Sequence, residues 1–283
     1  MQENPMTRKT VLDLLKMKAS NQKIAMVTAY DYSMARLAQA ADVDMVLVGD
    51  SVGMVVQGLP DTLAVTLDDM VYHGKCVARG LDKAHLVVDL PFMTYQVSPQ
   101  QALQSAGRLV QQTGCQSVKL EGGERSAPAI SLITQAGVPV VGHVGLTPQS
   151  VHAVGGWRVQ GRSEEAAEQL LRDAQAVQEA GAFCVVLEMV PAELAAEVTA
   201  ALDVPTIGIG AGPDCDGQVL VCNDLLGLNS SFKPRFVRRF AELEEPATDA
   251  FRGFVAAVRD GSFPAEEHCF HRRRPSAKVA RLY

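Results

Sequence analysis

The feature that most constrains the fold of this chain is a short apolar run that ends in an ionisable side chain and occurs five times. The run Met45–Val48 leads through Gly49 to Asp50 and Ser51. Similar runs lead to Asp89, Glu121, His143 and Glu188. A short, continuously apolar run is typical of a parallel strand that is buried on both faces. The pattern therefore predicts parallel strands that carry polar chemistry at their carboxyl ends.

Eight strands are predicted from these and similar runs: Ile24–Ala29, Met45–Gly49, Leu86–Leu90, Ser117–Glu121, Val138–Gly142, Cys184–Glu188, Thr206–Gly210 and Val219–Cys222. Helical patterns are predicted at Thr10–Met17, Ser33–Ala41, Leu67–Arg79, Pro99–Thr113, Arg125–Ala136, Ser163–Ala180, Pro191–Ala201, Lys233–Leu243 and Ala247–Arg259. Only residues 211–218 separate the last two strands, which is short for a crossover helix. Either that helix is a single turn or one of the two strands is wrongly assigned.

The alternation of strands and helices indicates an α/β fold in which helices cover a parallel sheet. Eight repeats favour a closed (β/α)8 TIM barrel over an open doubly wound sheet. We expect one catalytic domain over residues 1–271, with an N-terminal helix, and a mobile basic tail over residues 272–283. In a barrel the carboxyl ends of all strands meet at one face, so the five polar strand ends should form one site.

Composition excludes several classes of function. The 283 residues carry a net charge of -6 with acids and bases interspersed, which argues against nucleic-acid or anionic-membrane partners. No stretch is apolar enough to span a bilayer and the first residues lack a secretory pattern, so we expect a cytoplasmic protein. The six cysteines lack zinc-binding spacing and are expected to be buried free thiols.

Four of the five strand ends supply carboxylates, and three of these, Asp50, Asp89 and Glu121, are candidate metal ligands. Carboxylates that converge in one pocket repel one another, and a divalent cation would relieve that repulsion. Ligands that offer only oxygen favour a hard ion such as Mg²⁺ over zinc. The alternative is that each acid caps a helix or pairs with an arginine at the barrel rim.

Other polar residues beside these acids suit an anionic substrate. Lys119 lies two residues before Glu121 and so faces the same side of its strand, where it could pair with a carboxylate or a ligand. Ser51 offers a hydroxyl next to Asp50, and His143 is either a substrate contact or a hydrogen-bonded core histidine. The segment 53–66 is long and apolar enough to form a lid over the site.

Glu188 differs from the other acids because apolar residues flank it in the sequence from Val185 to Pro191. Hydrocarbon surroundings would raise its pKa and make it a proton acceptor rather than a metal ligand. A salt bridge to a neighbouring residue is the alternative.

Several stretches resemble the motifs of a known family, the ketopantoate hydroxymethyltransferases. These stretches read VGDSVGM, DLPFM, VKLEGG, GHVGLTPQS, GGWRVQGR, VLEMVP and IGIGAG, and the likeness extends from Lys23 to His268. The resemblance implies a (β/α)8 barrel and a Mg²⁺-dependent enzyme of pantothenate biosynthesis. It implies hydroxymethyl transfer from 5,10-methylenetetrahydrofolate to the 2-oxo acid 3-methyl-2-oxobutanoate, and a homodecamer of two pentameric rings.

Carried over residue by residue, the resemblance also implies roles in the site. Asp50 and Asp89 would hold the metal and contact the 2-oxo acid, Glu121 would complete the metal shell, and Glu188 would be the general base. Ser51 and Lys119 would bind the substrate, and we place His143 beside them. Two alternatives stay open: a Mg²⁺-dependent lyase or mutase of the phosphoenolpyruvate type, and a non-catalytic paralogue kept for assembly.

Overall fold

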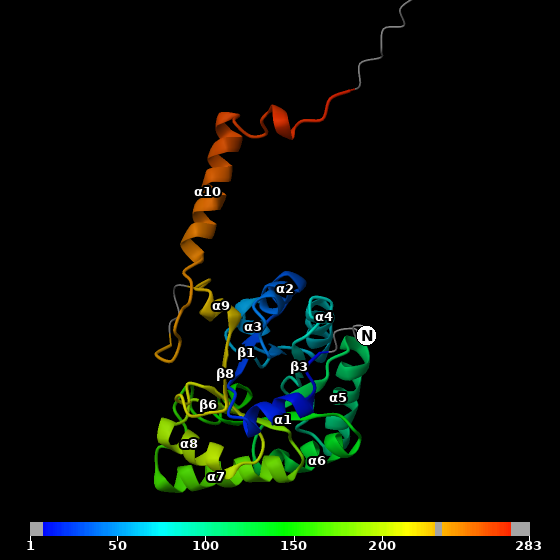
Figure 1. Cartoon of the computed structure of the whole chain (residues 1–283), viewed down its shortest axis with the longest axis vertical. Coiled ribbons are helices and arrows are strands. Elements are labelled where there is room, and N and C mark those ends of the chain that lie inside the picture. Colours follow the sequence, from blue (N-terminus) through cyan, green and yellow to red (C-terminus); the bar gives the residue numbers. More distant parts are fainter. Residues whose placement is uncertain (1–7, 230–233, 273–283) are drawn as a thin grey trace, which may run out of the picture.

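A closed barrel of eight parallel strands forms the centre of the computed structural model, which describes residues 8–229 and 234–272 (Figure 1). Each strand pairs with the next one along the chain, and the last pairs with the first. The strands are β1 (Ile24–Thr28), β2 (Met45–Val48), β3 (His85–Asp89), β4 (Ser117–Glu121), β5 (Val140–Gly145), β6 (Cys184–Glu188), β7 (Thr206–Ile209) and β8 (Gly217–Leu220). The predicted (β/α)8 TIM barrel is confirmed.

Helices alternate with the strands through most of the chain. They are α1 (Val11–Ala19), α2 (Tyr32–Ala40), α3 (Val52–Val55), α4 (Leu67–Ala78), α5 (Pro99–Thr113), α6 (Ala127–Gln135), α7 (Glu164–Glu179), α8 (Ala192–Ala201), α9 (Cys222–Leu225) and α10 (Glu244–Asp260). Side-chain oxygens of Thr10, Thr66, Ser98 and Ser163 accept hydrogen bonds from first-turn amides and so cap α1, α4, α5 and α7. These caps explain why the predicted helix starts lie within about one residue of the observed ones.

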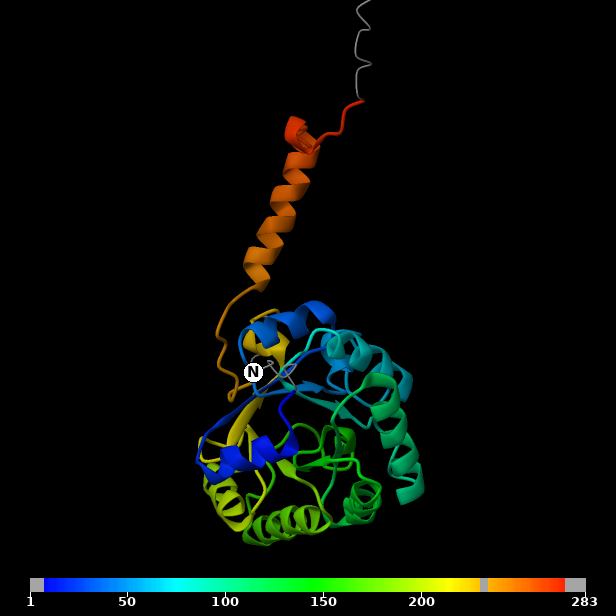
Figure 2. The same cartoon turned by 45° about the vertical axis from the view of Figure 1, so that its right-hand side comes forward.

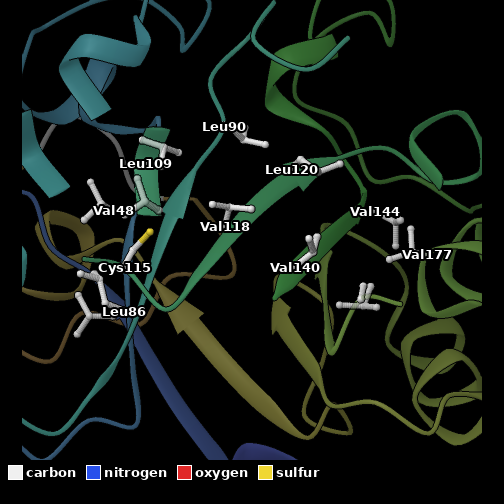
Figure 3. Close-up of a cluster of buried hydrophobic side chains, with 14 of the residues drawn as sticks. Val48, Leu86, Leu90, Leu109, Cys115, Val118, Leu120, Val140, Val144 and Val177 are labelled. Atoms are coloured by element: carbon white, nitrogen blue, oxygen red, sulfur yellow. The ribbon is translucent and has the colours of Figure 1, made fainter. Parts of the chain in front are cut away.

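Two hydrophobic layers hold the barrel together. Outward-facing strand residues pack against the helices, as Val118 and Leu120 of β4 do in the cluster that also contains Leu109 of α5 (Figure 3). Inward-facing residues fill the barrel interior: Met26, Met45, Val87, Val141, Val186, Ile207 and Val219, joined by Leu14 and Met17 of α1. Because α1 packs against this inner layer, it closes the amino-terminal side of the barrel. The buried polar side chains at that side are paired with each other, as His85 and Ser117 are at 2.9 Å.

Ion pairs fix α1 at the closed end of the barrel. Lys9, just before α1, lies 3.3 Å from Asp44, which precedes β2, and Lys18 of α1 lies 2.8 Å from Asp216, which precedes β8. Both acids belong to loops that enter strands. The opposite face, where the strands end, is therefore the face available for a site.

The structure decides whether a short helix or a wrongly assigned strand explains the brief connection between the last two strands. Both strands exist and pair in register, and the connection at residues 210–216 contains no helix. The last strand begins earlier than the predicted Val219–Cys222, because Gly217 pairs with both Ile24 and Ile207. A Cβ on Gly217 would come within 2.4 Å of the Ile24 carbonyl oxygen, so only glycine fits there. Glycine is a weak strand former, and the sequence pattern does not reveal it.

The helix predicted at Lys233–Leu243 is wrong for the described part of that range, residues 234–243, which is irregular. Its backbone amides bond elsewhere: Phe240 donates to the carbonyl of Leu225 at 2.9 Å, and Leu243 donates to that of Leu226 at 3.0 Å. These bonds hold the segment on the carboxyl end of α9, while a turn in which Val237 donates to the Pro234 carbonyl at 3.0 Å takes the place of the predicted helix.

Helix α10 extends away from the barrel in both views (Figures 1 and 2). None of its residues is buried, although Phe251 and Phe254 are large and apolar and are 73% and 55% exposed. The predicted tail at residues 272–283 lies outside the described residues except for Arg272. Among the helices of the two described ranges, none is long and apolar enough to cross a membrane. All six cysteines are free thiols, as predicted, but the predicted burial holds for four of them, because Cys269 is exposed and Cys76 is half-buried.

Candidate active site

The strand register brings the predicted polar residues together at the carboxyl face of the barrel. Asp89 on β3 lies opposite Lys119 on β4, and Glu121 on β4 lies opposite His143 on β5. Residues that are partners in a parallel register share one face of the sheet, and here that face is the barrel interior. Asp50 follows β2 by two residues, and all five side chains are buried.

A backbone hydrogen bond joins the first two acids of the site. The backbone amide of Asp50 donates a hydrogen bond of 3.0 Å to Asp89 Oδ2. A Cβ at Gly49 would lie 2.8 Å from Ser51 Oγ, so a larger residue there would displace that hydroxyl. The glycine that follows β2 therefore leaves room for the Ser51 side chain.

The two aspartates have strongly perturbed acidity. Burial, together with repulsion from Asp89 and Glu121, raises the pKa of Asp50 to about 8. Burial also raises the pKa of Asp89, although the Lys119 ammonium, 3.1 Å from Asp89 Oδ1, opposes this shift. This agrees with the predicted repulsion among the acids and indicates that the positive charge in the site does not fully balance them.

Lys119 is the cation that partly balances these acids. Burial lowers the pKa of its ammonium, but the carboxylates of Asp89, Glu121 and Asp50 outweigh this and raise the pKa above its usual value. Lys119 therefore remains charged at neutral pH. Of the two roles left open for it, pairing with a carboxylate is confirmed by the contact with Asp89.

His143 connects the lysine to the predicted base. Its Nδ1 lies 3.3 Å from Lys119 Nζ and 3.6 Å from Glu121 Oε1, and its Nε2 lies 3.2 Å from Glu188 Oε2. Burial and the Lys119 charge lower its pKa, but the contacts with Glu121 and Glu188 prevail and raise it to about 9. A protonated imidazole therefore faces the carboxylate of Glu188 at neutral pH.

The expectation that hydrocarbon surrounds Glu188 is wrong. Alternation along β6 turns Val185 and Leu187 into the outer layer and points Val186 and Glu188 into the barrel. The carboxylate, 13% exposed, pairs with His143 instead of lying among apolar side chains. His143 itself lies within β5, which extends to Gly145, rather than at the end of the strand.

Three polar residues of this face were not predicted from the sequence. The Tyr30 hydroxyl lies 2.8 Å from Ser51 Oγ, and the Tyr95 hydroxyl accepts a hydrogen bond of 3.1 Å from the amide of Glu121. The side chain of Gln149 donates a hydrogen bond of 2.8 Å to Asp50 Oδ2. None of them carries a charge at neutral pH, so a search for ionisable strand ends overlooks them. The stretch GHVGLTPQS contains Gln149 and is the part of the sequence that could have drawn attention to this residue.

The fit of a metal ion to this site rests on its two aspartates. Within residues 8–229 and 234–272, no group of three or more His, Cys, Asp and Glu side chains is placed to hold a metal. Mg²⁺, however, commonly uses one or two carboxylates and fills its other positions with water or substrate. Asp89 Oδ1 is buried with the Lys119 ammonium 3.1 Å away, and Asp50 lies beside it, since the Asp50 amide donates to Asp89 Oδ2. A pair of adjacent, oxygen-only ligands fits Mg²⁺.

Comparisons with solved structures support the fold. A phosphonopyruvate hydrolase determined with oxalate and Mg²⁺ aligns with a TM-score of 0.59 at 15% identity, covering 92% of this chain and 93% of its own. A phosphoenolpyruvate phosphomutase from Streptomyces platensis aligns with a TM-score of 0.61 at 14% identity, covering 93% and 92%. At this level of identity the likeness shows a common barrel and nothing about the reaction.

Sequence comparisons identify the family. The model of the ketopantoate hydroxymethyltransferase family matches residues 8–266. The 3-methyl-2-oxobutanoate hydroxymethyltransferase of Syntrophotalea carbinolica is 56% identical over 93% of this chain and 98% of its own length. The enzyme of the same name from Pelobacter propionicus is 54% identical over 93% and 97%. The chain therefore belongs to the ketopantoate hydroxymethyltransferase family.

Proposed function

We propose that this enzyme transfers a hydroxymethyl group from 5,10-methylenetetrahydrofolate to 3-methyl-2-oxobutanoate, giving 2-dehydropantoate (ketopantoate) for pantothenate and coenzyme A biosynthesis. The observation that carries the proposal is the division of the site into two halves. Asp50, Asp89 and Lys119 lie at one side of the barrel mouth, and the Glu188–His143 pair lies on β5 and β6. One half suits binding of an anionic 2-oxo acid, and the other suits removal of a proton.

The binding half would hold the substrate through charge and metal. Asp50 and Asp89 would hold Mg²⁺, with Glu121 completing the acidic set. When bound, the ion would supply Lewis-acid chemistry by withdrawing electrons from the 2-oxo group, which acidifies the neighbouring C3–H bond. Lys119, charged and buried, would attract the substrate carboxylate, and the Ser51 hydroxyl would donate a hydrogen bond to it.

The proton-removing half would contain the base. Glu188 would take the C3 proton, and the electron pair of the broken C–H bond would attack the methylene carbon of the folate. His143, 3.2 Å from the Glu188 carboxylate, would hold that group in place and contact the substrate. The donor carries a methylene group and the product a hydroxymethyl group, so one water molecule is consumed and supplies the hydroxyl oxygen.

No observation favours the two alternatives. The solved phosphonopyruvate hydrolase and phosphoenolpyruvate phosphomutase share 15% and 14% identity with this chain, which supports the fold alone. The non-catalytic alternative would fit a chain that lacks one of the proposed ligands or the base. Asp50, Asp89, Glu121 and Glu188 are all present and converge in the structure.

Assembly and location complete the proposal. The exposed Phe251 and Phe254 of α10 support a homo-oligomer in which another subunit covers this helix, because large apolar groups gain free energy when they are removed from water. The decamer implied by the family resemblance, the lid at residues 53–66 and the cytoplasmic location stay predictions. The first part of that lid is helical, since α3 occupies Val52–Val55.

A metal-dependence assay tests the proposed function. Protein stripped with a chelator is mixed with 3-methyl-2-oxobutanoate and 5,10-methylenetetrahydrofolate, and ketopantoate is followed by NMR with and without added Mg²⁺. We expect product only when metal, folate and oxo acid are all present. Product formation that is equally fast without Mg²⁺ would contradict the metal assignment, and absence of product under every condition would contradict the proposed reaction.

A further inference from the structure

One buried residue, Gln149, joins two of the acids of the proposed metal site. Gln149 is 5% exposed and belongs to the turn that follows β5. Its side-chain nitrogen donates to Asp50 Oδ2 at 2.8 Å and to the Leu90 carbonyl at 3.0 Å. Its backbone nitrogen donates to Glu121 Oε2 at 3.0 Å. One residue therefore holds one carboxylate oxygen of each of two proposed metal acids.

The surrounding groups fix which way the Gln149 amide points. The Tyr95 hydroxyl accepts the Glu121 amide proton, so its own proton is available to Gln149 Oε1, 2.7 Å away. The side-chain nitrogen of Gln96 lies 3.0 Å from the same oxygen. The other end of the amide faces two acceptors, Asp50 Oδ2 and the Leu90 carbonyl, and must be the NH₂ group. A flipped amide would set oxygen against oxygen at both positions.

This arrangement leaves particular oxygens for a cation. Asp50 Oδ2 is held by Gln149, and Asp89 Oδ2 is held by the Asp50 amide. Gln149 donates to Asp50 Oδ2 and not to Asp50 Oδ1, whereas Asp89 Oδ1 is paired with the Lys119 ammonium, 3.1 Å away. Hydrogen bonds to one oxygen of a carboxylate fix its rotation and so aim the second oxygen.

We propose that Gln149 is a positioning residue for the divalent cation. Its side chain holds the Asp50 carboxylate in the orientation that presents Oδ1 to the metal, and its backbone amide fixes Glu121, whose other oxygen faces His143 at 3.6 Å. Gln149 itself touches neither metal nor substrate. Its amide also partly offsets the repulsion among the acids before the metal binds. The inference rests on the proposed function, since it assumes that these acids bind Mg²⁺.

The test replaces Gln149 by methionine, which keeps the length and approximate volume of the side chain but removes its donors. Binding of Mn²⁺, as a probe for Mg²⁺, is measured by electron paramagnetic resonance in the full-length protein without substrates. We expect the Mn²⁺ dissociation constant of Gln149→Met to rise about tenfold to a hundredfold, as loss of one hydrogen bond to a charged group gives. In an Asp50→Asn background the same substitution should change the constant by less than about threefold, because its main partner is already neutral.

A matched control makes the same chemical change elsewhere. The Gln39 side chain accepts hydrogen bonds from the amides of Asp82 and Lys83, in the loop before β3, and Gln39→Met should leave Mn²⁺ binding unchanged. If Gln149→Met does not fold, Tyr95→Phe decides, because it removes the hydroxyl that holds the Gln149 carbonyl. The proposal is overturned if Gln149→Met binds Mn²⁺ as tightly as the wild type. If Gln149→Met does not fold, the same result in Tyr95→Phe overturns it. Failure of the wild type itself to bind Mn²⁺ would instead refute the metal site.

Discussion

Replacing Lys119 by methionine should destabilise the protein strongly, and more so at alkaline than at acidic pH. Methionine has a similar length but no charge, so the substitution leaves Asp89 and its neighbouring acids without their buried cation. In the wild type the Lys119 ammonium lies 3.1 Å from Asp89 Oδ1, and both side chains are at most 5% exposed. Removing one partner of a buried ion pair leaves an uncompensated charge, which is costly in a protein interior.

The separation of the two charges sets the size of the effect. At 3.1 Å and an effective dielectric constant of about 20, the Coulomb attraction is about 5 kcal/mol. The net loss of unfolding free energy should be about 3–5 kcal/mol near pH 8, as for other broken buried pairs. Near pH 5 the loss should be smaller, because Asp50 and Asp89, whose pKa values are already raised, can take up protons.

Chemical denaturation at one fixed protein concentration measures this effect, since assembly would make the stability depend on concentration. The double variant Lys119→Met with Asp89→Asn serves as the control and should regain part of the lost stability, because no charge is left unpaired in that pair. Saturating Mg²⁺ should also stabilise Lys119→Met more than the wild type. A Lys119→Met protein as stable as the wild type near pH 8 would refute the view that this ammonium balances the acids.

Three further predictions follow from the site and the chain end. Asp50→Asn should raise the Mg²⁺ concentration for half-maximal activity at least about tenfold. Its melting temperature should be unchanged or higher, because the substitution removes charge repulsion but keeps the volume of the side chain. A lower melting temperature with normal metal dependence would contradict this prediction. The melting temperature of metal-free protein should fall as pH rises from about 6.5 to 9. Folding raises the pKa of His143 to about 9 and that of Asp50 to about 8, so the folded state binds more protons than the unfolded state in this pH range. In His143→Gln this fall should be shallower, and an unchanged slope would exclude His143 as a cause. Deletion of the residues after His271 should leave turnover unchanged. If light scattering shows that the truncated protein has lost its oligomeric state, these residues are structural.

Much of the barrel follows from the sequence because its strands are short and apolar on both faces. The strands Ser117–Glu121 and Cys184–Glu188 and the helix Pro99–Thr113 match their predicted bounds. Each is delimited by local chemistry, such as the Ser98 cap and Pro99 at the start of α5. Period-two alternation also placed Lys119 and Glu121 on one face of β4, as the structure confirms.

The failures have tertiary causes. Gly217 belongs to β8 because of a close approach to Ile24, and residues 234–243 bond to the end of α9; neither fact is encoded within the segment itself. The surroundings of Glu188 were misjudged because its sequence neighbours face outward, whereas its neighbour in space is His143. Gln149 was overlooked because a neutral amide shows its importance only when Asp50 and Glu121, from two other parts of the chain, are seen beside it.

The central claim is that binding of the oxo acid and removal of its proton belong to different residues, and one exchange experiment tests it most directly. Glu188→Gln keeps the volume of the side chain but removes the basic oxygen. Exchange of the C3 proton of 3-methyl-2-oxobutanoate into D₂O is followed by NMR with enzyme and Mg²⁺ but without folate. Binding of the oxo acid is measured in parallel by calorimetry.

The proposed division of roles predicts that Glu188→Gln binds the oxo acid with near wild-type affinity but exchanges its C3 proton at least about a hundredfold more slowly, the lower end of what a general base contributes. Exchange as fast as in the wild type would contradict the assignment of Glu188 as the base and would make His143 the next group to test.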